Sequence, residues 1–177
     1  MLVSSLFIFI EVDEQSHVDF ISERTAEKIS GQKYTLSSLT TATGSALQYA
    51  PYGEKILYMT LYTNITQFTA NGTFLDYFFQ DDVLEFKTTE MALTVYELKS
   101  GILDHGGIGI NYPTENGTYK GFNYTYATLP QNRSGSGYFW GTAGYSGDFV
   151  FVITGQSPTP PDISMSAAAI DQINAMT

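Results

Sequence analysis

Residues 148–154 read Asp-Phe-Val-Phe-Val-Ile-Thr, and the run Phe149–Ile153 is apolar at every position. Neighbouring side chains on a β-strand point to opposite faces, so both faces of this strand must be covered. The preceding stretch, 135–147, is rich in glycine, which is typical of sharp bends or close approach of backbones. The pattern predicts either a barrel strand with a helix or a subunit on its outer face, or an inner strand of a sandwich.

Residues 32–156 form the body of the chain and read as a series of short strands separated by Gly, Pro or Asn. The predicted strands cover residues 34–43, 55–68, 73–79, 83–88, 91–98, 106–112, 119–128, 138–140 and 148–154. Strands of this length and spacing predict an all-β fold. We expect a single antiparallel β-barrel of about eight strands, with a β-sandwich or jelly roll as the alternative. No segment of the body shows helical periodicity.

The two ends differ from the body in composition. Residues 1–31 hold six acidic residues against two basic ones, and Leu6–Val12 is expected to form a first β-strand followed by a short helix or an irregular acidic segment. A signal peptide is the alternative for the apolar start, which is too short to span a membrane. Residues 157–177 begin with a Pro-rich linker and could end in a short C-terminal helix.

Composition excludes several classes of function. The 177 residues carry 18 acidic and 8 basic side chains, and a net charge of −10 disfavours nucleic acid as a partner. The absence of cysteine excludes disulfides, thiolate nucleophiles and cysteine-based metal sites. The two histidines, His17 and His105, are isolated in the sequence, so no metal site and no cofactor is predicted.

Sequons suggest a secreted or cell-surface glycoprotein. Five of the seven asparagines begin an Asn-x-Ser/Thr triplet: Asn64, Asn71, Asn116, Asn123 and Asn132. Asn-Gly-Thr is also ordinary hairpin chemistry, which offers an alternative explanation for Asn71 and Asn116.

Two short motifs resemble the allene oxide cyclase and dirigent superfamily. Residues 141–147, Gly-Thr-Ala-Gly-Tyr-Ser-Gly, are similar to its glycine-rich turn, and Asp81-Asp82-Val83-Leu84 is similar to the dirigent stretch with a pocket aspartate. The resemblance implies an oligomeric eight-stranded barrel that binds a small hydrophobic or phenolic molecule and assists its cyclisation or coupling. Cyclases of this type use a pocket cysteine, which this chain lacks, so the resemblance favours a dirigent-like or simple ligand-binding function.

Asp81 and Asp82 are the candidate catalytic residues. On a strand their side chains point to opposite faces, so only one of them can face a given pocket unless a bulge intervenes. An inward aspartate whose pKa is raised by desolvation could act as a general acid or base. The alternative is a solvated acidic turn between two strands.

Four aromatic residues are the candidate ligand-binding residues. Tyr124 and Tyr126 share one face of a predicted strand, and Tyr138 and Trp140 share a face of another. Such rings can stack on phenolic or sugar ligands, but they can equally pack in the core or at a subunit interface. The sequence therefore leaves two hypotheses: a dirigent-like ligand-binding barrel, or a non-catalytic extracellular glycan-binding or assembly protein. It does not decide whether the protein is an enzyme.

Overall fold

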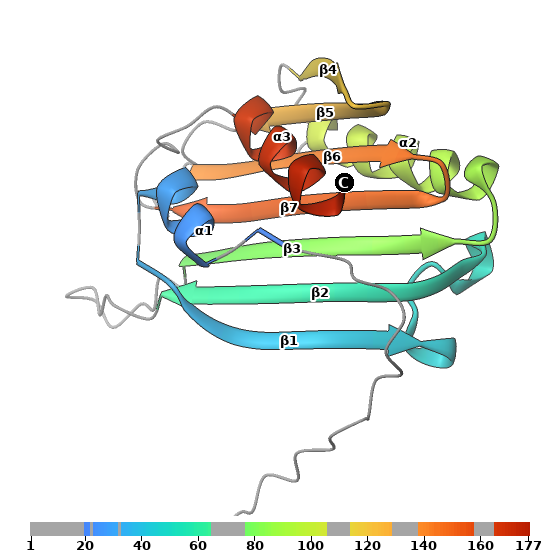
Figure 1. Ribbon diagram of the computed structural model, residues 1–177, viewed down its shortest axis with the longest axis horizontal. Coiled ribbons are helices and arrows are strands. Elements are labelled where there is room, and N and C mark those ends of the chain that lie inside the picture. The colour runs from blue at the N-terminus through green and yellow to red at the C-terminus, as the bar shows by residue number, and fades with distance from the viewer. Residues whose placement is uncertain are drawn as a thin grey trace, which may run out of the picture.

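The described residues form one open antiparallel sheet (Figure 1). The computed structural model describes residues 20–21, 23–31, 33–64, 77–105, 114–128, 138–157 and 165–177. The sheet has seven strands in the order β1-β2-β3-β7-β6-β5-β4. The strands are β1 (Thr35–Thr43), β2 (Glu54–Asn64), β3 (Tyr77–Phe86), β4 (Glu115–Tyr119), β5 (Phe122–Thr128), β6 (Tyr138–Ser146) and β7 (Phe149–Ser157).

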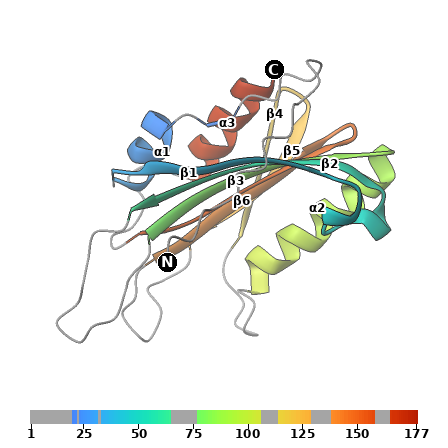
Figure 2. The same cartoon turned by 90° about the horizontal axis from the view of Figure 1, so that it is seen from below.

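Helices cover both faces of the sheet (Figure 2). The helices α1 (Glu23–Ser30) and α3 (Met165–Met176) lie on one face, which we call the α1/α3 face. The helix α2 (Thr89–His105) lies on the opposite face, which we call the α2 face. Two short 3₁₀ turns, η1 (Gly44–Ala46) and η2 (Ala50–Tyr52), connect β1 to β2.

Over the residues that the structure describes, the sheet is open and does not close into the expected barrel. The strands β1 and β4 are the two outer strands of the sheet and do not pair with each other. The three helices bury the apolar faces of the sheet, so neither closure nor a second sheet is needed to do so. The predicted all-β fold is confirmed in its coarser form, because strands outnumber helices in the described residues, and the short C-terminal helix is present.

The sequence predicts no helix in the body of the chain. This prediction is wrong at residues 91–98, which belong to α2. The side chains of Ala92 and Val95 are buried against the sheet, and those of Tyr96 and Leu103 pack beside them. Successive members of this set, Ala92, Val95, Tyr96 and Leu103, are three, one and seven residues apart, which places them on one face of a helix. The hydroxyl of Thr88 caps the helix by accepting a hydrogen bond from the Met91 N–H at 3.3 Å. Thr94, Val95 and Tyr96 favour a strand locally, and this hid the helical period in the sequence.

Two segments that were expected to separate strands lie inside strands in the structure. Asp81-Asp82 does not interrupt the chain but lies inside β3, where both residues pair with β2 and β7. Asn116-Gly117 lies within β4 and not in a turn. The β4–β5 hairpin turns at Lys120 and Gly121, which both have positive φ angles, of 46° and 82°. Two consecutive positive φ angles are typical of a tight hairpin turn.

The N-terminal predictions are tested only in part. The predicted first strand Leu6–Val12, and the alternative of a signal peptide, lie outside the described residues. The helix α1 agrees with the short helix expected in the acidic segment.

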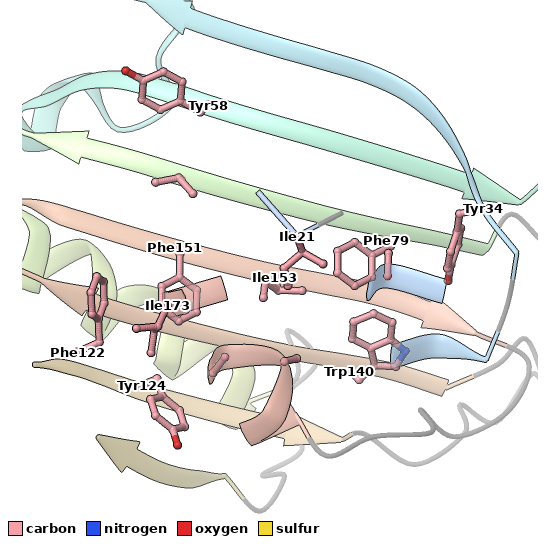
Figure 3. Packing of buried hydrophobic residues seen from close by; sticks show 14 residues of the cluster. Ile21, Tyr34, Tyr58, Phe79, Phe122, Tyr124, Trp140, Phe151, Ile153 and Ile173 are labelled. Atoms are coloured by element: carbon pink, nitrogen blue, oxygen red, sulfur yellow. The ribbon is translucent and has the colours of Figure 1, made fainter. Parts of the chain in front are cut away.

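The coverage of β7 on both faces is confirmed. Phe151 and Ile153 belong to the core cluster of the α1/α3 face, together with Trp140 and Ile173 (Figure 3). The alternating residues Val150 and Val152 belong to the cluster beneath α2.

Glycines on β4, β6 and β7 make room for large rings on the neighbouring strands. Gly144 pairs with Phe151 on one side and with Tyr124 on the other, and a Cβ at Gly144 would overlap the Phe151 ring. A Cβ at Gly155 would likewise overlap the ring of Trp140, its cross-strand partner. The glycine-rich stretch predicted sharp bends or close approach of backbones, whereas at Gly144 the structure shows a ring of the neighbouring strand lying across the glycine.

We expect Gly144→Ala to destabilise the fold by roughly 1–3 kcal/mol, because the Phe151 ring must leave its position. Gly101→Ala is the matched control, since Gly101 lies in α2 with open space around its Cα. Alanine should raise the free energy of unfolding there by roughly 0.5–1 kcal/mol. Urea unfolding measures both variants. Equal stability of Gly144→Ala and the wild type would contradict the ring-over-glycine packing.

Candidate functional site

An open groove of about 570 Å³ lies on the α2 face, between α2 and the β4–β5–β6 edge of the sheet. We call it the α2 groove. It is lined by Leu93, Tyr96, Glu97, Asn116, Gly117, Thr118, Asn123, Tyr124 and Tyr145. Only one of these side chains is aliphatic, so the lining consists mainly of aromatic rings, amides, a hydroxyl and a carboxylate.

Two tyrosines from different elements form the aromatic wall of the α2 groove. The Tyr96 ring on α2 and the Tyr145 ring on β6 lie 4.7 Å apart between centroids, with an interplanar angle of 37°. Both side chains are half-buried, so part of each ring faces the groove. Such a pair offers an apolar surface edged by two phenol oxygens.

A chain of hydrogen bonds connects this wall to the edge of the sheet. The Tyr96 hydroxyl lies 2.7 Å from Thr125 Oγ1, and Thr125 Oγ1 donates to Asn116 Oδ1 at 2.6 Å. Asn116 and Thr125 are cross-strand partners in the β4–β5 hairpin, which places both side chains on the α2 face. Burial raises the pKa of Tyr96, and the hydrogen bond with Thr125 partly offsets this. Tyr96 is therefore a neutral hydrogen-bonding group at physiological pH.

Asp81, a predicted catalytic residue, lies on the α1/α3 face and far from bulk water. Its side chain has no exposed surface, and its Oδ2 accepts a hydrogen bond from the Ile21 N–H at 3.1 Å. Within the described part of the chain, Oδ1 has no hydrogen-bond partner. Burial raises the pKa of Asp81 to about 8, opposed by the bond from Ile21 and assisted by Asp82. Asp81 therefore ties the segment before α1 to the centre of the sheet.

Asp82, the second predicted catalytic residue, points to the opposite face, as the alternation of a strand requires. Gln80 Nε2 donates to both of its carboxylate oxygens, at 3.0 and 2.8 Å. Burial raises the pKa of Asp82 to about 6, against the effects of Gln80 and Lys99. Burial also raises the pKa of Glu54, whose Oε2 accepts the Tyr49 N–H at 2.6 Å.

Lys99 on α2 is the positive charge that faces these carboxyl groups. It favours the charged forms of both Asp82 and Glu54, and its Nζ lies 5.0 Å from the centroid of the Tyr49 ring. The contact with Tyr49 links α2 to the connection between β1 and β2. Neither Asp81 nor Asp82 lines the α2 groove, so the structure does not bring the predicted acids together with the groove.

The four predicted ligand-binding rings share the α1/α3 face. Trp140 is 2% exposed and packs on Phe79, with ring centroids 5.4 Å apart. The Tyr124 hydroxyl lies 3.0 Å from Ser166 Oγ on α3, and the Tyr126 hydroxyl donates to Glu115 at 2.8 Å. Tyr124 also borders the α2 groove at the strand edge. Tyr138 is half-buried at the start of β6.

Two of the five predicted sequons meet at the α2 groove. Asn116 and Asn123 lie on neighbouring strands, expose their side chains and line the groove. Asn64 is the last residue of β2. Asn71 and Asn132 lie outside the described residues.

Among the described residues, no group of three or more His, Asp or Glu side chains is arranged to hold a metal ion. None of the described helices is long and apolar enough to cross a membrane.

Sequence reasoning missed Tyr96, Glu97 and Tyr145 as site residues. Tyr96 and Glu97 were assigned to a strand, and only the helical spacing of Ala92, Val95 and Leu103 places them on one helix beside the sheet. Tyr145 is the aromatic residue within the glycine-rich stretch 141–147, so it was visible in the sequence but had no predicted role.

Comparisons with protein-family models and with curated proteins found no match. Among solved structures, the fold is similar to the extracellular domain of PknH from Mycobacterium tuberculosis, with a TM-score of 0.48 and 10% sequence identity. The similarity covers 81% of this chain and 84% of that chain. A likeness at this level carries no functional assignment.

We expect the stability of the wild type to fall between about pH 4 and pH 8 because of Asp81. Its folded-state pKa of about 8 exceeds the value of about 4 typical of an unfolded chain, so the native state holds a proton that the unfolded state releases. This contribution is fully present below pH 4 and is lost as the pH rises towards 8. Asp81→Asn keeps an acceptor for Ile21 and cannot ionise. At pH 8 it should exceed the wild type by at least about 1.4 kcal/mol, measured by urea unfolding.

Asp82→Asn provides the control for this pH experiment. The pKa of Asp82 is about 6, so only about 0.4 kcal/mol of its effect on stability remains above pH 6. Between pH 6 and 8 the stability of Asp82→Asn should fall in parallel with that of the wild type, whereas that of Asp81→Asn should not. A parallel fall in both variants would contradict the assignment to Asp81.

Proposed function

We propose that this protein is a non-catalytic binding domain for neutral saccharides, and that the α2 groove is its binding site. The observation that carries the proposal is the half-buried ring pair Tyr96–Tyr145 beside the exposed amides of Asn116 and Asn123. A pyranose ring has an apolar face of C–H groups and a rim of hydroxyls. Tyrosine rings match the first, and amide, hydroxyl and carboxylate groups match the second.

The lining of the α2 groove favours a sugar over a purely hydrophobic molecule. Leu93 is its only aliphatic side chain, whereas Asn116, Thr118, Asn123 and Glu97 contribute polar groups. Sites for hydrophobic ligands are lined mainly by apolar side chains with a few polar groups. The groove is also open to solvent, which suits one segment of a longer chain molecule.

The charges of the α2 groove favour a neutral ligand. Glu97 is the only charged residue in the lining, and the whole chain carries a net charge of −10. Among the described residues, neither lysine nor arginine lines the groove to balance an anionic sugar, which the field of the protein would repel.

Binding rather than cleavage is proposed because the groove offers one carboxylate. Most glycoside hydrolases use a pair of carboxyl groups that flank the scissile bond. Glu97 has no acidic partner in the lining, and Asp81 and Asp82 lie elsewhere on the sheet.

We also propose that the protein acts outside the cell or on its surface. The sequons support this location, but Asn116 and Asn123 must be unmodified for the α2 groove to bind a ligand. In this proposal, glycans are attached at Asn64, Asn71 or Asn132 instead.

We expect Tyr145→Ala to weaken saccharide binding at least about tenfold, because it removes half of the aromatic wall. The probes are cellohexaose, mannohexaose and chitohexaose, measured by isothermal titration calorimetry at low salt. Tyr52→Ala is the control, since Tyr52 is exposed and lies outside the groove on η2. It should leave the affinity unchanged.

Coniferyl alcohol, a phenolic probe, separates this proposal from the dirigent-like hypothesis. Binding of coniferyl alcohol with no binding of the three hexasaccharides would contradict the saccharide proposal. Equal loss of saccharide affinity in Tyr145→Ala and Tyr52→Ala would place the binding site elsewhere.

A further inference from the structure

We infer that Thr125 sets the hydrogen-bonding polarity of the α2 groove by holding the Asn116 amide with its NH₂ group towards the ligand. Thr125 is thus a positioning residue, and the ligand must present an oxygen that accepts from Asn116 beside a hydroxyl that donates to Tyr96 or Glu97. A vicinal diol of a sugar ring has this chemistry. The inference rests on the proposed function.

The direction of the hydrogen bonds follows from the single hydroxyl proton of Thr125. That proton is donated to Asn116 Oδ1 at 2.6 Å. In the second hydrogen bond, of 2.7 Å, the Tyr96 hydroxyl is therefore the donor and Thr125 Oγ1 is the acceptor. The order of donation is Tyr96 to Thr125 to Asn116.

This order leaves a defined set of groups for a ligand. The Asn116 Oδ1 is directed to Thr125, so its Nδ2, with two hydrogens, is the part of the amide left for the groove. The proton of Tyr96 is also used, so its oxygen can only accept from a ligand. The carboxylate of Glu97, on the same helix as Tyr96, is a second acceptor.

Thr125 is suited to fix this arrangement because it cannot reorient freely. It is 4% exposed, in the middle of β5, and pairs directly with Asn116 on β4 and with Ala143 on β6. A β-branched side chain in a strand is restricted at χ1, so the position of its hydroxyl is defined by the backbone. Asn116, by contrast, is exposed and would sample several orientations without this bond.

The experiment compares four single variants and one double variant with the wild type. The probe is the hexasaccharide that the wild type binds, and all proteins come from a bacterial host that lacks N-glycosylation. Thr125→Val keeps the shape of the side chain and removes the hydroxyl, so the dissociation constant should rise about tenfold. Thr125→Ser restores the hydroxyl and should bind within about threefold of the wild type. Thermal unfolding shows whether the Thr125 variants are folded.

Asn116→Asp is the variant that separates positioning from folding. The aspartate still accepts from Thr125 but offers the ligand an acceptor in place of the NH₂ donor. It lies at an exposed position, so the fold should be kept while the affinity falls at least about tenfold. The affinity lost in Thr125→Val combined with Asn116→Ala should be clearly smaller than the sum of the two single losses, because Thr125 acts mainly through Asn116.

Each result has a distinct meaning. Wild-type affinity in Asn116→Asp or Thr125→Val, or full additivity of Thr125→Val and Asn116→Ala, would overturn the role of Thr125 and leave the proposed function standing. Absence of binding by the wild type to all three hexasaccharides would overturn the proposed function and this inference with it.

Discussion

The ring of Phe151 lies across Gly144, and this contact fixes the register between β7 and β6. Tyr124 flanks the same glycine from β5, so the register extends to the edge of the sheet. A slip of one residue would move every side chain of a strand to the other face. Tyr145 would then leave the α2 groove. The groove therefore depends on where the glycines lie.

Glycines also allow α2, which forms one side of the α2 groove, to pack closely on the rest of the fold. A Cβ at Gly53, whose φ is +76°, would overlap Met91 at the start of α2, and a Cβ at Gly141 would lie 2.8 Å from Leu103 Cδ2 near its end. The helix is thus held close to the sheet at both ends by the absence of side chains beneath it. Tyr96 lies between these two points, which brings its ring within reach of Tyr145.

The strands were predictable and the groove was not, for physical reasons. An apolar run such as Phe149–Ile153 is enough to predict a strand that is buried on both faces. Because successive side chains of a strand point to opposite faces, Asp81 and Asp82 were also expected on opposite faces. The segment 91–98 fits two periods, and tertiary burial decides for the helix. The α2 groove joins residues of α2 to residues of β4, β5 and β6, so no local pattern could show it.

The sequons acquire a second explanation from the structure. Asparagine and threonine recur in Asn116-Gly-Thr118 and Asn123-Tyr-Thr125, and the same amides and hydroxyls line or support the α2 groove. An N-linked glycan is attached through the amide nitrogen of asparagine, which is the group of Asn116 that faces the groove. Glycosylation and ligand binding therefore exclude each other at this residue. The sequence-based argument for a secretory route rests accordingly on the three other sequons, Asn64, Asn71 and Asn132.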